Sequence, residues 1–427
     1  MNINRSVSIL MFFSLVLLGG CFTFQQNAKQ VVNTGTSNAS DFSSMYNPSS
    51  SVVNPQLTAF VSSANEAEVY FRIRTQELRN AIAYPLEEEI NVYVRYFLRD
   101  ASNFHLADTA SLRYTFDVTK GEYVYGYFKV ALGEQIRYKL VVDFANSKYN
   151  VKKRLLCDIK NISGFNDDKY IVRTLSDEVI FTNVVPVGQE VKVFGGSGVD
   201  GTVNVEFYRE REYVSLPPYL SSPVKQVNVP DSVFSYSYGE ALHLSEPGLY
   251  AFGSTAKNEK FGIVATSNTS YPSVTKVADM LEPMKLLCTE REFAAIDTSS
   301  ALKRSIDAFW LGLSKTEKGA KEQIRVFYSR VALANMLFPS SVEGWKTDRG
   351  MIYIMLGPPT VVNITPNSEE WIYGSGEQGM MFTFENNSGI RNDFSLLRSN
   401  VYQALWQQVS ATWRSGKIFT VSKLNDE

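Results

Sequence analysis

The residues best suited to form a binding site are concentrated near the run Gly-Trp-Lys-Thr-Asp-Arg-Gly at positions 344–350. This run combines a large aromatic ring that carries one N–H donor with two adjacent opposite charges, a combination that suits polar recognition. Two more aromatic side chains follow further along the chain. A groove for a peptide, a glycan or a partner loop would be lined by Trp345, Asp348, Arg349, Tyr353 and Trp371.

The same run also fits a structural turn, and we favour this interpretation. Gly344 and Gly350 would permit backbone angles that are closed to other residues. Thr347 and Asp348 would accept hydrogen bonds from nearby backbone amides before a strand. Arg349 would pair with Asp348 or with a carboxylate earlier in the chain. Such a turn would lock a pair of helices onto a sheet.

Catalytic chemistry finds little support in the sequence. Asp348 or Glu370 could serve a hydrolase as an acid, but the run 344–350 contains no histidine or nucleophile. The two histidines, His105 and His243, are far apart, and neither a His-Glu-x-x-His zinc motif nor a Gly-x-Ser-x-Gly motif occurs. We therefore assign no catalytic residue, no metal site and no cofactor, and we expect the protein not to be an enzyme.

Cys21 lies directly after a segment that is typical of protein export. Val7–Leu18 is a largely apolar run of 12 residues, which is too short to span a membrane and is typical of a signal peptide. The sequence Leu18-Gly19-Gly20-Cys21 resembles the bacterial lipoprotein box. The resemblance implies that residues 1–20 are removed and that Cys21 carries acyl chains such as palmitate, which anchor the protein in a membrane. The alternative is an ordinary signal peptide with a chance cysteine nearby.

Residues 21–54 are rich in Asn, Ser, Thr and Gln, and this composition predicts a flexible tether. Acidic residues directly after the cysteine mark surface export in some Bacteroidota lipoproteins, but here Phe22–Gln26 contains none. We therefore expect the protein on the periplasmic side of the outer membrane rather than on the cell surface.

Other reactive side chains are scattered. Cys157 and Cys288 fall in different predicted domains, so two separate buried thiols are favoured over a disulfide. The tripeptides around Thr109 and Ser232, Asp-Thr-Ala and Asp-Ser-Val, resemble the Bacteroidota O-glycosylation signal. That resemblance implies that Thr109 and Ser232 are glycosylation sites.

The elements that must position these residues begin with strands. Val69, Phe71 and Ile73 alternate with other residues, which indicates a half-buried strand, and the same period recurs across residues 55–163. A second block with this alternation covers residues 164–270. We predict a mainly β protein with two tandem antiparallel β-sandwich domains of the immunoglobulin-like type.

The period becomes helical over residues 271–340, where apolar residues recur at steps of three and four. Residues 341–427 are predicted to return to strands at 351–356 and 380–384 and to end in an amphipathic helix. The order predicts a C-terminal α+β domain that packs with the helical segment. The two sandwiches would project this domain away from the membrane.

A family resemblance rests on an ordered set of motifs. Around the run 344–350 these are Phe309-Trp310, Tyr328-Ser329-Arg330-Val331, Ala334-Asn335, Gly357-Pro358-Pro359 and Trp371-Ile372-Tyr373. The set resembles the GWxTD domain family, found mainly in Bacteroidota and neighbouring phyla, over about residues 280–415. The acidic, proline-containing segment that members often carry after the Phe-Trp pair is replaced here by residues 312–317. The resemblance implies an exported protein and no particular reaction.

Composition limits the remaining functions. The side-chain balance is −2, from 42 basic and 44 acidic residues, which argues against a nucleic-acid partner. We expect an outer-membrane lipoprotein that binds another envelope protein through its GWxTD domain, in an oligomeric state that the sequence does not fix. The alternatives are a glycan-binding surface lipoprotein and a hydrolase of envelope polymers.

Overall fold

The computed structural model describes most of the chain beyond residue 40. The described residues are 29–30, 41–81, 88–134, 136–146, 151–161, 167–196, 201–210, 214–221, 229–254, 259–365, 368–374, 379–386 and 392–421. The predicted signal peptide and the predicted lipid attachment at Cys21 lie outside them. None of the helices in these ranges is long and apolar enough to cross a membrane.

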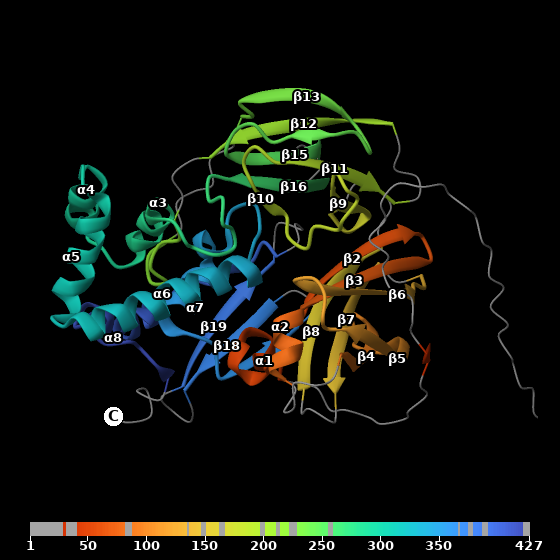
Figure 1. Cartoon of the computed structure of the whole chain (residues 1–427), viewed down its shortest axis with the longest axis horizontal. Helices are drawn as coiled ribbons and strands as arrows, with labels where there is room; N and C mark the ends of the chain where they lie inside the picture. The colour runs from red at the N-terminus through yellow and green to blue at the C-terminus, as the bar shows by residue number, and fades with distance from the viewer. Residues whose placement is uncertain are drawn as a thin grey trace, which may run out of the picture.

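Residues 56–160, together with the short strand at residues 29–30, form the first sandwich, in which a five-stranded sheet faces a three-stranded one (Figure 1). Val69, Phe71 and Ile73 are fully buried between the sheets, as their alternation predicts. The Phe71 ring lies 5.1 Å from Tyr114 and 5.2 Å from Phe144, measured between centroids. The larger sheet has the order β1 (Lys29–Gln30), β5 (Leu106–Asp117), β4 (Glu89–Asp100), β7 (Arg137–Asn146) and β8 (Val151–Lys160). The smaller has β2 (Gln56–Ser63), β3 (Glu66–Arg74) and β6 (Tyr123–Ala131), and α2 (Thr75–Asn80) follows β3.

Residues 167–266 form the second sandwich on the same plan. Val193, Val205 and Phe252 are fully buried in its core. Its strands pair antiparallel, apart from β10 with β16. One sheet has the order β10 (Val184–Pro186), β16 (Glu259–Thr266), β15 (Gly248–Ser254), β12 (Thr202–Arg209) and β13 (Ser232–Ser237). The other has β14 (Leu242–His243), β11 (Glu190–Gly195) and β9 (Tyr170–Thr174), preceded by η2 (Asp167–Lys169).

The C-terminal module, residues 271–421, combines helices with a four-stranded antiparallel sheet. Trp310, Trp371 and Trp413 are fully buried in its core, so the helical segment and the sheet share one interior. The helices are α3 (Val277–Leu281), η4 (Glu282–Leu286), α4 (Glu290–Asp297), α5 (Leu302–Ser314), α6 (Glu317–Leu337), η5 (Gly344–Lys346), α7 (Asp348–Leu356), η7 (Asn400–Tyr402) and α8 (Gln403–Arg414). The sheet has the order β17 (Val361–Ile364), β18 (Ser368–Tyr373), β19 (Met380–Glu385) and β20 (Ser395–Leu396). The predicted fold class, two antiparallel sandwiches followed by an α+β domain, is confirmed.

The apolar run 351–356 is helical, and its assignment to a strand was wrong. Thr347 caps α7, because its side-chain oxygen accepts a hydrogen bond from the Gly350 N–H at 3.0 Å. The helix ends at Gly357, whose φ of 91° favours glycine. Every residue from Asp348 to Leu356 is buried. A helix buried on all sides shows no amphipathic stripe, so its sequence resembles that of a buried strand.

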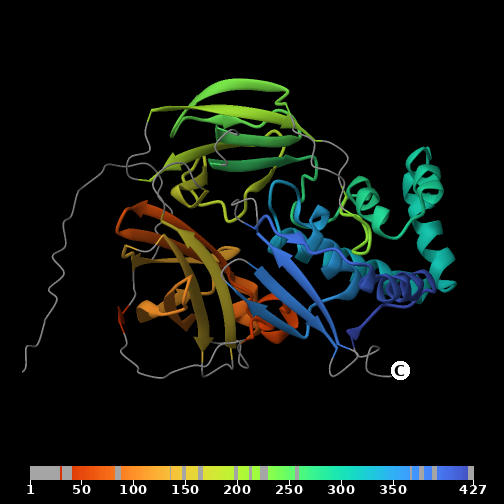
Figure 2. The same ribbon diagram turned by 180° about the vertical axis from the view of Figure 1, so that it is seen from behind.

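The three modules pack against one another in a triangle rather than in a row (Figures 1 and 2). Phe97 and Val141, from the outer face of the first sandwich, belong to the core of the C-terminal module. Phe60 of the first sandwich packs with Ile171 and Val179 of the second. The C-terminal domain is therefore held by both sandwiches and is not projected away from them.

The predicted tether, residues 21–54, is wrong for its second part. Residues 41–54 form α1 (Ser43–Tyr46) and η1 (Pro48–Ser50), and Phe42 and Tyr46 are buried in the core of the C-terminal module. Two aromatic side chains supply the apolar surface that the polar composition obscured. Of residues 21–40, the structure describes only 29–30, which pair with β5.

Cys157 and Cys288 lie in different modules and are not joined by a disulfide, as the favoured interpretation predicts, but both are partly buried rather than fully buried. Burial raises the pKa of Cys288 to about 12, and the thiolate is the reactive form. We expect both thiols to be alkylated after denaturation without reductant, and Cys288 to react slowly in the native protein. Peptide mass mapping checks this, and a peptide linked through both cysteines would contradict it.

Candidate functional site

Two glycines of the signature run, residues 344–350, allow the backbones of α6, η5 and α7 to come into contact. A Cβ atom on Gly344 would lie 2.0 Å from the carbonyl oxygen of Ala334 in α6. A Cβ atom on Gly350 would lie 2.0 Å from the carbonyl oxygen of Gly344. Neither glycine has a positive φ, so the expectation that they adopt special backbone angles was wrong. They are required because α6, η5 and α7 lie closer together than any side chain permits.

Trp345 is held by Asn335, which belongs to the Ala334-Asn335 motif, and by Glu343, which the sequence did not single out. Its backbone N–H donates to the side-chain oxygen of Asn335 at 3.1 Å, and its indole N–H donates to Glu343 at 2.9 Å. The Asn335 amide donates to the carbonyl of Pro272 at 3.1 Å, while its backbone carbonyl accepts from the Tyr271 hydroxyl at 2.6 Å. Trp345 is therefore a core residue joined to α6 and to the loop that leaves the second sandwich.

The next residue, Lys346, connects the run to the second sandwich. Its ammonium group pairs with Glu343 at 3.0 Å and with Glu210, which follows β12. Glu343 also accepts a hydrogen bond from the hydroxyl of Thr266, the last residue of β16. The side chains of Lys346 and Glu343 are 9% exposed, so these charges are largely removed from water and must be paired.

Asp348 makes a second connection to the same sandwich. Its carboxylate accepts from the Ser215 hydroxyl, from the Leu396 N–H at 2.8 Å and from the Arg398 guanidinium. Arg398 also donates to the carbonyls of Leu216 and Pro217, at 2.7 and 2.8 Å. Residues 214–221 lie between β12 and β13, so Asp348 and Arg398 hold a loop of the second sandwich against the C-terminal module.

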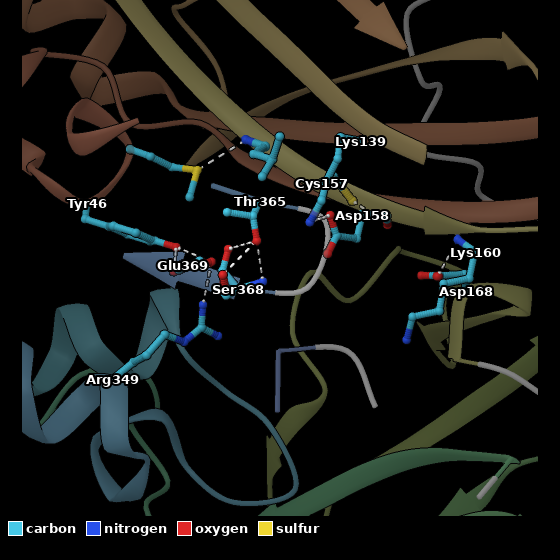
Figure 3. Close-up of polar contacts among 12 residues, drawn as sticks. Tyr46, Lys139, Cys157, Asp158, Lys160, Asp168, Arg349, Thr365, Ser368 and Glu369 are labelled. Atoms are coloured by element: carbon cyan, nitrogen blue, oxygen red, sulfur yellow. Dashed lines mark hydrogen bonds and ion pairs between the residues drawn. The ribbon is translucent and has the colours of Figure 1, made fainter. Parts of the chain in front are cut away.

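The side chain of Arg349 points toward Glu369 of β18, as Figure 3 shows. Its guanidinium pairs with Glu369 at 3.1 Å and donates to the Asn392 carbonyl at 3.0 Å. The same carboxylate accepts from the Tyr46 hydroxyl at 2.9 and 3.0 Å and from the Trp371 indole at 3.0 Å. Burial and the Glu369 charge together raise the pKa of Tyr46 well above its usual value. Arg349 therefore neutralises a carboxylate in the interior, where an unpaired charge would be costly.

A cavity of about 290 Å³ with both polar and apolar lining lies beside this pair, where the three modules meet. On the side of the first sandwich, Lys139 pairs with Asp158 at 2.7 Å, and the backbone N–H of Lys160 donates to Asp168 at 2.8 Å (Figure 3). The cavity is thus lined by charges of both signs that have partners.

Lys153 of β8 binds the segment that carries Tyr46. Its ammonium group donates to the carbonyls of Ser44 and Asn47, at 2.6 and 3.0 Å. Burial lowers the pKa of Lys153 to about 8, below the value of about 10.4 in an unfolded chain. Between these two pH values the unfolded state binds more protons than the folded state. The contribution of Lys153 to the free energy of unfolding therefore rises with pH over this range, and it is lost as the pH falls through 8.

A Lys153→Met variant should lose this contribution. We expect the difference in unfolding free energy between wild type and variant to grow in favour of wild type from pH 8 to pH 10. Urea midpoints measured across that range provide the test, and two parallel profiles would show that Lys153 does not titrate as described.

The five predicted groove residues are brought together only in part, and all are buried. Arg349, Tyr353 and Trp371 surround Tyr46, whereas Trp345 and Asp348 face the second sandwich. The exposed groove that they were predicted to line is absent among the described residues, because residues 41–50 cover one side and the second sandwich covers the other. The proposed pairing of Arg349 with an upstream carboxylate or with Asp348 was also wrong, since Glu369 lies downstream.

The two predicted glycosylation positions stand apart from this site. Thr109 lies on β5 and Ser232 begins β13, and the structure leaves both residues exposed. The Thr109 hydroxyl donates to the Tyr96 carbonyl at 2.6 Å. Neither residue belongs to the signature run or its partners.

Sequence reasoning missed Glu369, Arg398 and Asn335 as partners of the run. Glu369 alternates with Trp371 and Tyr373 on the buried face of β18, a signal that was available, whereas its neighbour Glu370 is less buried. No comparable signal marks Arg398, because its partners on the loop 214–221 lie about 180 residues earlier.

Comparisons with known proteins agree with the signature run. No curated protein matches the chain. One solved structure with similarity is a C-terminal 282-residue fragment of intimin, in complex with the intimin-binding domain of the translocated intimin receptor. It has 10% identity over 82% of this chain and 94% of that chain, with a TM-score of 0.16, which is too low to support any inference. The family model of the GWxTD domain matches residues 248–415. The chain therefore carries a GWxTD domain that starts at β15 of the second sandwich and extends through α8 of the C-terminal module.

Proposed function

We propose that this protein is a lipid-anchored, non-enzymatic scaffold of the bacterial cell envelope, facing the periplasm from the outer membrane. In this proposal the GWxTD signature fixes the arrangement of three modules, and the assembled molecule binds another envelope protein. The supporting observation is that different residues of the run bind different modules. Lys346 and Asp348 bind the second sandwich, while Arg349 reaches through Glu369 to the N-terminal segment.

Of the two carboxylates considered for a hydrolase, Asp348 is 7% exposed and already accepts hydrogen bonds from Ser215, Leu396 and Arg398. Glu370 is half-buried on the other face of β18 from Trp371, where its carboxylate accepts from the Asn363 amide. General acid–base catalysis requires a group within hydrogen-bonding reach of substrate. The aromatic residues predicted to line the groove, Trp345, Tyr353 and Trp371, are buried as well, so they offer no face to a sugar. Both observations favour a scaffold over a hydrolase or a glycan-binding protein.

The anchor is tested by replacing its thiol. In cells supplied with labelled palmitate, we expect the wild-type protein to be labelled and to sediment with membranes. The Cys21→Ser variant should lack the label and move to the soluble fraction. Cys157→Ser is the matched control and should behave as wild type. Recovery of the wild-type protein without acyl chains in the soluble fraction would contradict the proposed lipid anchor.

The scaffold role is tested by affinity capture from detergent-solubilised envelopes. We expect one partner in a fixed ratio with the wild-type protein. Arg398→Ala, which frees the loop 214–221, should reduce capture. Arg325→Gln is the control, because Arg325 is exposed and pairs within its own helix with Glu322. Recovery of the protein alone after gentle crosslinking would count against the proposal.

A further inference from the structure

Residues 41–50 lie on the C-terminal module in the way that a bound peptide lies on a receptor. The Phe42 N–H donates to the carbonyl of Val362 at 3.0 Å, and the Val362 N–H donates to the Asp41 carboxylate at 3.0 Å. Val362 belongs to β17, an edge strand of the four-stranded sheet. An edge strand offers unpaired backbone groups to another segment, and here it pairs with the residues directly before α1.

Four residues further on, Tyr46 fills a socket. Its ring lies 5.0 Å from that of Trp371 and 5.2 Å from that of Phe338, and the side chain is 3% exposed. Its hydroxyl donates to Glu369, and its backbone carbonyl accepts from the Tyr353 hydroxyl at 2.8 Å. The socket therefore contacts the aromatic ring, the hydroxyl and the backbone carbonyl of the same residue.

The segment is separate from the module that binds it. Its contacts to Glu369 and Tyr353 join residues that are more than 300 positions apart in the sequence. After Tyr46 the chain turns to the first sandwich, where Lys153 binds the Asn47 carbonyl and the Leu156 N–H donates to the Met45 sulfur at 3.2 Å. The first sandwich thus covers the outer side of the segment, and the GWxTD domain binds the inner side.

We infer that the GWxTD domain contains a peptide-binding site for a segment of the form Phe-x-x-x-Tyr, and that residues 41–50 occupy it as a releasable ligand from the same chain. The site comprises the β17 edge at Val362 and the socket formed by Phe338, Tyr353, Glu369 and Trp371. This inference stands apart from the proposed function, because the socket binds the segment whether or not Cys21 is acylated. If the anchor is present, the site ties the membrane-proximal segment directly to the signature run through Arg349.

If residues 41–50 are a releasable ligand, they should leave the C-terminal module while its core stays folded. In native-state hydrogen exchange of the wild-type protein, the amides of residues 41–50 should exchange at least about tenfold faster than those of α7, by local opening. Equal protection of the two segments at all denaturant concentrations would make residues 41–50 a permanent part of the core, and would overturn the inference.

A vacated socket should accept the peptide from solution. We would add a synthetic peptide of residues 41–52 to the full-length Tyr46→Ala variant and follow its thermal midpoint. The midpoint should rise saturably, whereas that of wild type should not change, because its site is filled. A peptide with alanine in place of the tyrosine is the control and should have no effect.

Three results would contradict the site. The variant could show native circular dichroism and no response to the peptide, the control peptide could act equally well, or wild type could respond as strongly as the variant. If Tyr46→Ala does not fold, Tyr46→Phe takes its place, since it keeps the ring and loses only the hydroxyl. That variant should then show faster exchange in residues 41–50 with α7 unchanged, and unchanged exchange would overturn the inference.

Discussion

Replacing Arg349 by methionine should lower the free energy of unfolding by about 3–5 kcal/mol, because it leaves Glu369 charged and buried without its cation. Arg349 is 2% exposed and Glu369 is 5% exposed, so water cannot take over the role of the guanidinium. The loss also removes the contact of the guanidinium with the Phe394 ring, 4.2 Å from its centroid. Urea unfolding followed by tryptophan fluorescence measures the effect.

The double variant Arg349→Met with Glu369→Gln separates charge from packing. The Glu369→Gln change keeps an oxygen for the Tyr46 and Trp371 donors but removes the charge. The double variant should therefore be more stable than Arg349→Met alone, and the two effects should be strongly non-additive. Additive effects would show that the two side chains do not act as a pair.

Gly344→Ala should destabilise the protein by about 3 kcal/mol, at the upper end of overpacking effects. The added Cβ would meet the Ala334 carbonyl at 2.0 Å, and this oxygen belongs to the backbone of α6, which cannot move as a side chain would. Gly350→Ala should act in the same way through the Gly344 carbonyl.

Gly312→Ala is the matched control for both glycine variants. Gly312 lies within α5, and a Cβ there would have nothing within 4 Å. Alanine at that position should stabilise the protein by about 0.5–1 kcal/mol, as expected for a helix interior. A Gly344→Ala variant as stable as wild type would show that α6 and the signature run are not in backbone contact.

The parts of the fold that could be predicted from the sequence are those in which one face is buried. Val69, Phe71 and Ile73 alternate because one side of β3 faces the core, and the stripe along α6 reflects one buried helix face. The run 351–356 gave no such signal, since α7 is enclosed on all sides. Only its caps, Thr347 and Gly357, distinguish it from a strand.

The candidate site was harder to predict, because its partners are brought together by tertiary packing. The sequence identified Asp348 and Arg349 as charges that need partners, but Arg398 and Glu369 meet them from different elements. Tyr46 was hidden in a polar segment that resembles a tether. Two aromatic residues, Phe42 and Tyr46, do not alter such a composition, although both are buried in the core of the C-terminal module.

The junction role of the signature run can be measured as a distance between modules. Spin labels on bio-orthogonal residues at the exposed positions Val233 in β13 and Leu311 in α5 would report how the second sandwich lies relative to the C-terminal module. Pulsed electron resonance should give one narrow distance distribution for wild type. It should give a broad one for Asp348→Asn, in which the charge that binds Arg398 is lost while circular dichroism stays native. A distribution as narrow in Asp348→Asn as in wild type would contradict the account.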